Sequence, residues 1–157
     1  MKQLIVTTVL LLSVFINAQT NYEKGMQKAF QLWQTNEPIE ASNLFERISA
    51  AESDNWLPFY YAAQINITSS FGERNEEKLS QQLSKAQDLI NDATAISKNN
   101  PEILVLQALL HTAWVAYDGA TYGMTLPPKV SELYTKASQI DANNPRVVYC
   151  KAAWAMG

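Results

Sequence analysis

The sequence predicts an all-α fold. Apolar residues recur at the three-four spacing of an amphipathic helix in most segments, no segment shows the sustained alternation typical of a strand, and a nine-residue pattern returns at an offset of 44 residues. The chain of 157 residues has the size of one domain. With 47% hydrophobic and 17% charged residues, it has enough apolar side chains to bury a core.

The first two helices are expected at residues 21–35 and 38–52. In each of them, five apolar side chains fall on one stripe of an amphipathic helix. The stripe of the first helix is Tyr22, Met26, Ala29, Phe30 and Trp33, and the stripe of the second is Ala41, Leu44, Phe45, Ile48 and Ala51. The spacing therefore predicts one apolar face on each helix.

Three longer helices are expected at 56–69, 75–98 and 101–117. The first two of these again carry a single stripe, and the segment from Ile103 to Tyr117 is apolar almost all round. The stripes are Trp56, Phe59, Tyr60, Ala63 and Ile67 in one, and Leu79, Leu83, Ala86, Ile90 and Ala93 in the other. A helix that is apolar on all sides is typical of one packed between neighbours, so the helix at 101–117 is expected at the centre.

The last two helices are expected at 128–141 and 145–156. The repeated pattern places Asn-Asn-Pro at 99–101 and again at 143–145. Asparagine caps a helix because its side-chain oxygen accepts a free backbone N–H, and proline at the first helical position loses no hydrogen bond. Asn100-Pro101 and Asn144-Pro145 are therefore expected to open helices, as Ser53-Asp54-Asn55 does before Trp56.

Small residues recur at regular places in these helices, and the pattern resembles the tetratricopeptide-repeat (TPR) family. In that family two antiparallel helices form a unit, and small residues lie where the helices touch. The second-helix pattern of small, large and small positions corresponds here to Ala41-Phe45-Ile48, Ala86-Ile90-Ala93 and Val130-Tyr134-Ala137. The small first-helix position corresponds to Ala29, Ala63, Ala108 and Ala152.

The spacing of these positions supports the resemblance. The steps from 41 to 63, 86 to 108 and 130 to 152 are each 22 residues, as the family requires. The steps from 63 to 86 and 108 to 130 exceed the step from 29 to 41, which indicates insertions within two pairs, near 69–77 and at 118–128. The resemblance implies a domain at 19–157 with about 3.5 repeats in a right-handed superhelical solenoid, whose concave groove is lined by first helices.

The resemblance also points to groove residues that would contact a protein or peptide partner. The strongest candidates are the groove-facing side chains with polar or aromatic character: Tyr60, Gln64, Glu102, Arg146 and Tyr149. Met26, Phe30, Val105 and Leu109 map to the same face, but they are also suited to packing between helices. The family's carboxylate-clamping Lys and Asn residues are absent from these positions, which argues against a clamp for acidic peptide ends.

The helix at 145–156 carries apolar side chains, and no covering helix follows it in the sequence. Terminal repeats normally present a polar outer face. Two interpretations remain open for this end: a truncated reading frame, or a partner or second copy that packs there.

The N-terminus predicts export. Lys2, an apolar run from Leu4 to Ile16 and the ending Asn17-Ala18-Gln19 match a secretory signal peptide at 1–18, cleaved near Ala18. The run is too short to span a bilayer, so no stable membrane insertion is expected after cleavage. The ending resembles exported proteins of flavobacteria and their relatives, which implies a periplasmic or extracellular location.

The composition offers little for catalysis. His111 is the only histidine and is expected to be hydrogen-bonded in the core, and Cys150, the only cysteine, is expected to be a small buried residue. Glu76 and Glu77 are expected in the first turn of a helix, where they complement the helix dipole. We therefore expect no enzyme activity, no metal site and no cofactor. The formal net charge of −3 and the absence of a basic cluster argue against nucleic acid.

Two hypotheses for function remain. The first is an exported scaffold that binds a protein or peptide partner in the cell envelope. The alternative is a small-ligand or glycan-binding module with an aromatic pocket under the loop 118–128. Candidate loop residues are Tyr117, Tyr122 and Met124, with Trp114 beneath them. Loops that decorate one edge of a solenoid often carry its function.

Overall fold

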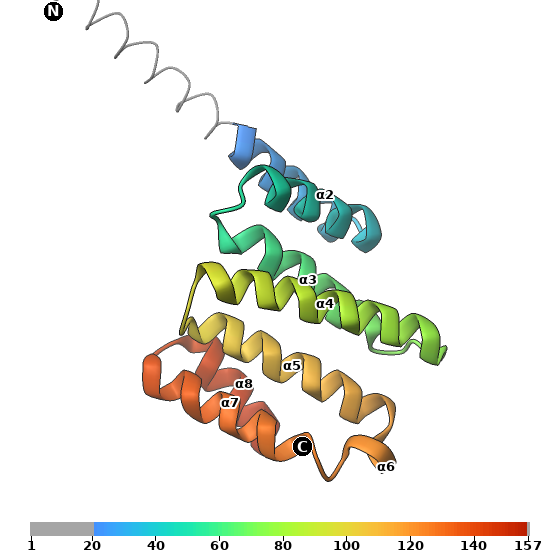
Figure 1. Cartoon of the computed structure of the whole chain (residues 1–157), viewed down its shortest axis with the longest axis vertical. Coiled ribbons are helices and arrows are strands. Elements are labelled where there is room, and N and C mark those ends of the chain that lie inside the picture. The colour runs from blue at the N-terminus through green and yellow to red at the C-terminus, as the bar shows by residue number, and fades with distance from the viewer. Residues whose placement is uncertain (1–20, 157) are drawn as a thin grey trace, which may run out of the picture.

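The computed structural model describes residues 21–156, and they form helices joined by short connections (Figure 1). The helices are 21–34, α2 (Pro38–Ala51), α3 (Trp56–Ser70), α4 (Glu76–Ile96), α5 (Pro101–Tyr117), α6 (Gly119–Tyr122), α7 (Pro127–Ile140) and α8 (Pro145–Met156). No strand occurs in this part of the chain, so the all-α class is confirmed. The predicted signal peptide lies outside the described residues.

The seven expected helices are all present, with ends within two residues of those predicted. Their starts follow the capping rules. The side chains of Asn55 and Asn100 accept hydrogen bonds from the backbone N–H groups of Leu57 and Glu102, at 3.1 and 2.9 Å. Asn75, which the sequence reading did not single out, caps α4 in the same way by accepting from the N–H of Lys78 at 2.9 Å.

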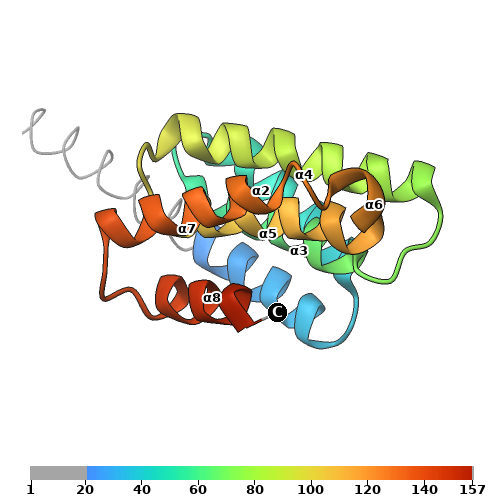
Figure 2. The same cartoon turned by 90° about the horizontal axis from the view of Figure 1, so that it is seen from below.

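The helices stack as antiparallel pairs along the longest axis of the molecule. Helix 21–34 folds back on α2, α3 on α4, and α5 on α7 (Figure 1). α5 also packs against α3, α4 and α8, which places it inside the stack as its apolar surface predicts. Seen from below, α4 lies at one edge of the molecule and α8 at the opposite edge (Figure 2).

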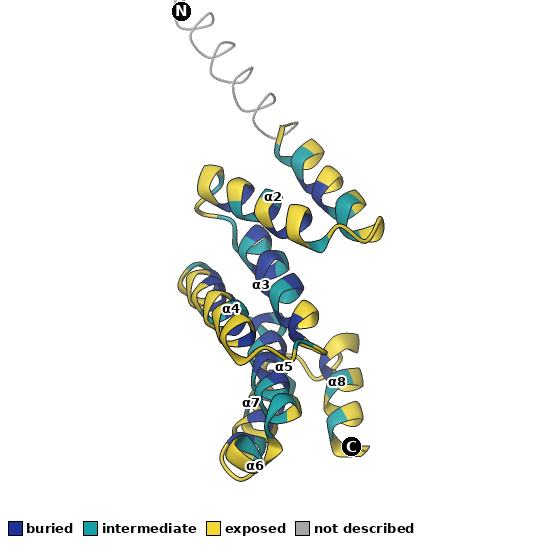
Figure 3. Ribbon diagram, turned by 90° about the vertical axis from the view of Figure 1, so that its right-hand side faces the viewer, coloured by how far each residue is buried: buried dark blue, intermediate teal, exposed yellow. Residues whose placement is uncertain are grey.

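The small side chains of the repeated pattern are mostly buried. Seven of the alanines that the spacing singles out, and Val130, are fully buried: Ala29, Ala41, Ala63, Ala86, Ala93, Ala108 and Ala137. A large core runs from helix 21–34 to α5, and a smaller one joins α5, α7 and α8. Buried residues are concentrated along α3 and α5, whereas the residues of α8 are mainly exposed or half-buried (Figure 3).

The two insertions take different forms. The first mostly lengthens helix α4, which has 21 residues against 14 in α2 and in α7. It leaves a short turn in which Gly72 has φ of +101°, a backbone conformation that side chains other than glycine rarely adopt. The second, expected as a loop over 118–128, contains the short helix α6. Asp118 caps α6 by accepting from the N–H of Thr121 at 3.0 Å, and α7 begins at Pro127, within the expected loop.

Candidate binding sites

Three of the predicted groove residues contact one another rather than facing solvent separately. Tyr60 on α3, Glu102 on α5 and Arg146 on α8 form a polar cluster that joins three helices. The Arg146 guanidinium lies 3.1 Å from the Glu102 carboxylate and donates a hydrogen bond to the Tyr60 hydroxyl. The hydroxyl donates to Glu102 at 3.4 Å, and Asn144 donates to the other Glu102 oxygen at 2.8 Å. We call these four residues the tyrosine–arginine cluster.

Burial sets the chemistry of this cluster. Tyr60 is only 3% exposed, and burial raises the pKa of its phenol further than the nearby Arg146 cation lowers it. The phenol therefore stays protonated and available as a donor at neutral pH. The expectation that Tyr60 is an open groove side chain is wrong, because α5 and α8 cover it.

The other two predicted groove residues differ in exposure. Gln64, one turn after Tyr60, is half-buried, and its buried Oε1 atom has no hydrogen-bond partner among the described residues. Tyr149 on α8 is 74% exposed. The aliphatic and aromatic residues mapped to the same face pack inward: Val105 is buried, and the Phe30 ring contacts Phe45 and Tyr61 with centroids 5.2 and 4.6 Å apart. Leu109 packs against the same core, and Met26 is buried within it.

The outer face of α8 is apolar and exposed. Val148, Tyr149 and Met156 are 54%, 74% and 82% exposed, and of this helix only Val147 is buried. Ala152 is exposed as well, although Ala63 and Ala108 at the corresponding positions of α3 and α5 are fully buried. We call Val148, Tyr149, Ala152 and Met156 the α8 face.

The aromatic loop residues separate into different places. Tyr122 on α6 contacts Trp114 on α5, with ring centroids 5.2 Å apart and planes inclined by 50°. Both rings line an open cavity of about 480 Å³ between α4, α5 and α6, which we call the α6 cavity. Met124 is 89% exposed and does not line the α6 cavity.

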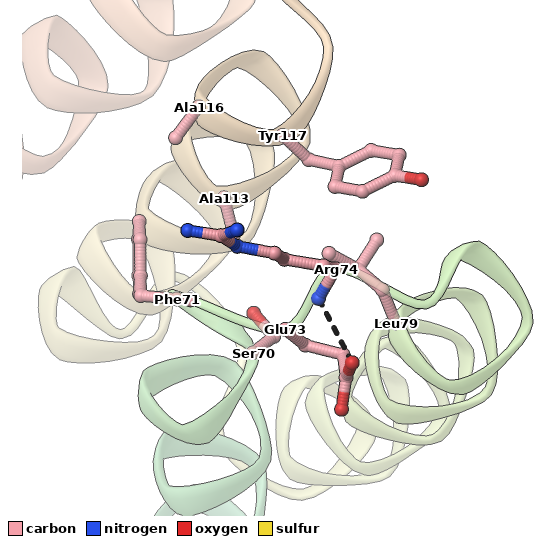
Figure 4. A pocket seen from close by; sticks show the side chains of 9 residues that line it. Ser70, Phe71, Glu73, Arg74, Leu79, Ala113, Ala116 and Tyr117 are labelled. Atoms are coloured by element: carbon pink, nitrogen blue, oxygen red, sulfur yellow. Dashed lines mark hydrogen bonds between the residues drawn. The ribbon is translucent and has the colours of Figure 1, made fainter.

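Tyr117 lines a different cavity, of about 290 Å³, beside the turn between α3 and α4. Figure 4 shows the Arg74 side chain extending between the Phe71 and Tyr117 side chains and passing just below Ala113 in this view. Glu73 bends back to accept from the backbone N–H groups of Arg74 and Asn75, each at 2.8 Å, and these bonds lower its pKa. This carboxylate therefore stabilises the turn, and Tyr117 belongs to a site apart from that of Tyr122.

His111 lies at the edge of the core, not inside it. It is half-buried, lines the α6 cavity, and its Nε2 atom lies 3.5 Å from the Nε2 atom of Gln107. Burial lowers its pKa, and the Lys129 cation lowers it further. The core position expected from its apolar neighbours is therefore wrong. Its three-residue spacing from Trp114 was the available sign that both side chains share one face of α5.

The remaining reactive groups are isolated. Cys150 is half-buried, and burial raises the pKa of its thiol, which disfavours the nucleophilic thiolate. Among residues 21–156, no three His, Cys, Asp or Glu side chains gather in a way that suits a metal ion.

No helix in the described range has the length and apolar character needed to cross a membrane. Comparison of the chain with protein-family models, curated proteins and solved structures finds no match.

Proposed function

We propose that the chain is an exported TPR-like scaffold that binds a helical segment of a partner protein in the cell envelope and carries out no catalysis of its own. Antiparallel helix pairs, with small buried residues at the 22-residue spacing, support the TPR-like solenoid. The apolar run that precedes Ala18 supports export.

The α8 face is the observation that carries this proposal. Met26, Tyr60 and Val105, each three residues before a small first-helix alanine, are 7%, 3% and 3% exposed. The corresponding residue of α8 is Tyr149, and it is 74% exposed. The α8 face thus has the residue pattern of a covered helix surface, but no segment within residues 21–156 covers it, and exposed apolar patches of this kind mark interaction sites.

The corresponding surfaces of α3 and α5 indicate what kind of partner fits the α8 face. On α3 and α5, the corresponding surface accepts another helix, and a small alanine lets that helix approach closely. A partner helix with an apolar stripe fits the α8 face in the same way. Lys151 lies beside this face, and α8 carries no acidic side chain, so acidic residues flanking the stripe are favoured.

The tyrosine–arginine cluster serves this function indirectly. Its hydrogen bonds hold the first turn of α8 against α3 and α5. With its side chains engaged in this way, the cluster contributes rigidity to the binding surface. The main contact with the partner is left to Tyr149 and its apolar neighbours, since exposed aromatic residues commonly supply most of the binding energy at an interface.

Affinity capture tests the proposal. Residues 19–157 are used as bait in an envelope extract, beside Tyr149→Glu on the α8 face and a matched control, Ile39→Glu, at a 71% exposed residue of α2. We expect a specific protein to be held by the unchanged chain and by Ile39→Glu, and to be lost from Tyr149→Glu. Thermal unfolding of all three forms shows whether a loss of binding is a loss of folding. Equal capture by both variants would place the interface elsewhere.

A further inference from the structure

The α6 cavity combines features that the proposed partner surface does not use. It lies between the antiparallel helices α4 and α5, and Tyr122 and Leu126 add to its lining. Its volume of about 480 Å³ falls within the range of small-molecule sites. α8 contributes no residue to its lining, so the cavity is separate from the α8 face.

Two aromatic rings form the apolar side of the cavity. Trp114 and Tyr122 are inclined by 50°, so that together they make a wedge rather than a flat stack. Both side chains are half-buried, which leaves part of each ring accessible to a ligand. Leu83 and Leu110 extend this apolar surface. A ring-shaped ligand with one apolar face fits against such a wall.

Hydroxyl and amide groups form the opposite side. Ser80 and Ser84 are exposed, and neither hydroxyl has a hydrogen-bond partner among the described residues, whereas the Ser138 hydroxyl on α7 donates to a backbone carbonyl of its own helix. Gln87 lines the cavity one turn further on and exchanges hydrogen bonds with Gln107 at 2.8 and 2.9 Å. These bonds hold the Gln87 amide in one orientation, while the serine hydroxyls remain available to a ligand.

Charge is missing from the lining. The nine described residues that form the cavity include no Asp, Glu, Lys or Arg. The lining includes the titratable His111 and Tyr122, and burial and then the Lys129 cation lower the pKa of His111, which favours its neutral form. A charged ligand would lose hydration here without gaining an opposite charge, so the cavity favours a neutral one.

We infer that the α6 cavity binds a neutral saccharide ring. The apolar face of the ring lies against Trp114 and Tyr122, and its hydroxyl groups exchange hydrogen bonds with Ser80, Ser84 and His111. The site is independent of the α8 face, and it assigns a role to the α6 segment, whose Asp118 cap fixes the position of Tyr122.

NMR titration of the His111 ring tests this inference, because the only histidine of the chain lies in the cavity. The probes are glucose, galactose, mannose and N-acetylglucosamine, with glucuronate and galacturonate as charged analogues. At pH 7.5, at least one neutral sugar is expected to shift the His111 signals in a saturable way, with affinity on the order of millimolar. The charged analogues are expected to bind at least about tenfold more weakly. Absence of a saturable shift with all four neutral sugars would overturn the inference.

Variants locate the binding. Trp114→Ala is expected to weaken the sugar about tenfold, which corresponds to about 1.4 kcal/mol of lost contact. Ser80→Ala with Ser84→Ala tests the site without disturbing the core, because both side chains are exposed, and is expected to weaken binding severalfold. Phe71→Ala, in the neighbouring cavity, is the matched control and is expected to bind as the unchanged chain does. Unchanged affinity in the double serine variant would contradict the proposed contacts, even if Trp114→Ala fails to fold.

Discussion

At the scale of single residues, the tyrosine–arginine cluster shows what sequence spacing captures and what it misses. The spacing placed Tyr60, Glu102 and Arg146 on one face of successive first helices, and the structure brings them together there. Their mutual hydrogen bonds could not be predicted, because contact between residues 86 positions apart depends on how closely the helices approach. The other two predicted groove residues, Gln64 and Tyr149, take no part in the cluster.

Removing the Tyr60 hydroxyl tests the cluster. Tyr60→Phe keeps the ring and the ion pair between Arg146 and Glu102 but deletes the two partly buried hydrogen bonds of the hydroxyl. The free energy of unfolding is expected to fall by about 1 kcal/mol in urea denaturation. Tyr61→Phe is the control, because the Tyr61 hydroxyl has no hydrogen bond within the described chain, and it is expected to change stability little. Equal effects of the two variants would show that the cluster contributes nothing specific.

The His111 pKa gives a prediction about pH. Burial favours the neutral imidazole, so the folded-state pKa lies below the ordinary value of 6.5. The unfolded chain then binds a proton more readily than the folded one. Stability is therefore unaffected by His111 above about pH 6.5 and decreases as the pH falls from there through the lowered pKa.

NMR titration of the His111 ring measures this pKa directly, and His111→Gln should flatten the corresponding part of the stability profile. A measured pKa at or above 6.5 would contradict the half-buried position that the structure gives His111.

At the scale of helices, the sequence was sufficient for nearly every element. Apolar stripes and asparagine caps act locally, so the positions and ends of seven helices follow from them. α6 was missed because its four residues are too few for an apolar stripe to show, and its start depends on the single cap Asp118. The sequence also could not predict that Tyr117 and Tyr122 line different cavities, because the directions of these side chains depend on the orientation of α6.

The asparagine caps Asn100 and Asn144 are expected to differ in their effect. Asn144 accepts from the backbone N–H groups of Arg146 and Val147 and also donates to Glu102, whereas Asn100 caps α5, whose helix packs within the stack. Since α8 buries only Val147, Asn144→Ala is expected to open α8 locally and speed its amide exchange by about tenfold or more.

Asn100→Ala is expected instead to lower the global free energy of unfolding by about 1 kcal/mol. Hydrogen exchange of both variants separates the two effects. Uniformly faster exchange in Asn144→Ala would show that α8 does not open independently of the rest.

At the scale of the whole molecule, the arrangement of the helices decides where binding is favoured. Met26, Tyr60 and Val105 are buried, whereas the corresponding Tyr149 is exposed on α8, which lies at one edge of the molecule (Figure 2). The α6 cavity lies between α4 and α5, away from that helix. The sequence pattern predicted which residues share a face, but not which face remains open, because exposure is a property of the assembled helices.

Hydrogen–deuterium exchange of residues 19–157, with and without the captured envelope protein, tests the central proposal most directly. Binding through the α8 face predicts slower exchange in 145–156, unchanged exchange in the α4 and α5 segments that line the α6 cavity, and no protection at all in Tyr149→Glu. Protection confined to the segments around Trp114 and Tyr122, with α8 unchanged, would contradict partner binding through α8.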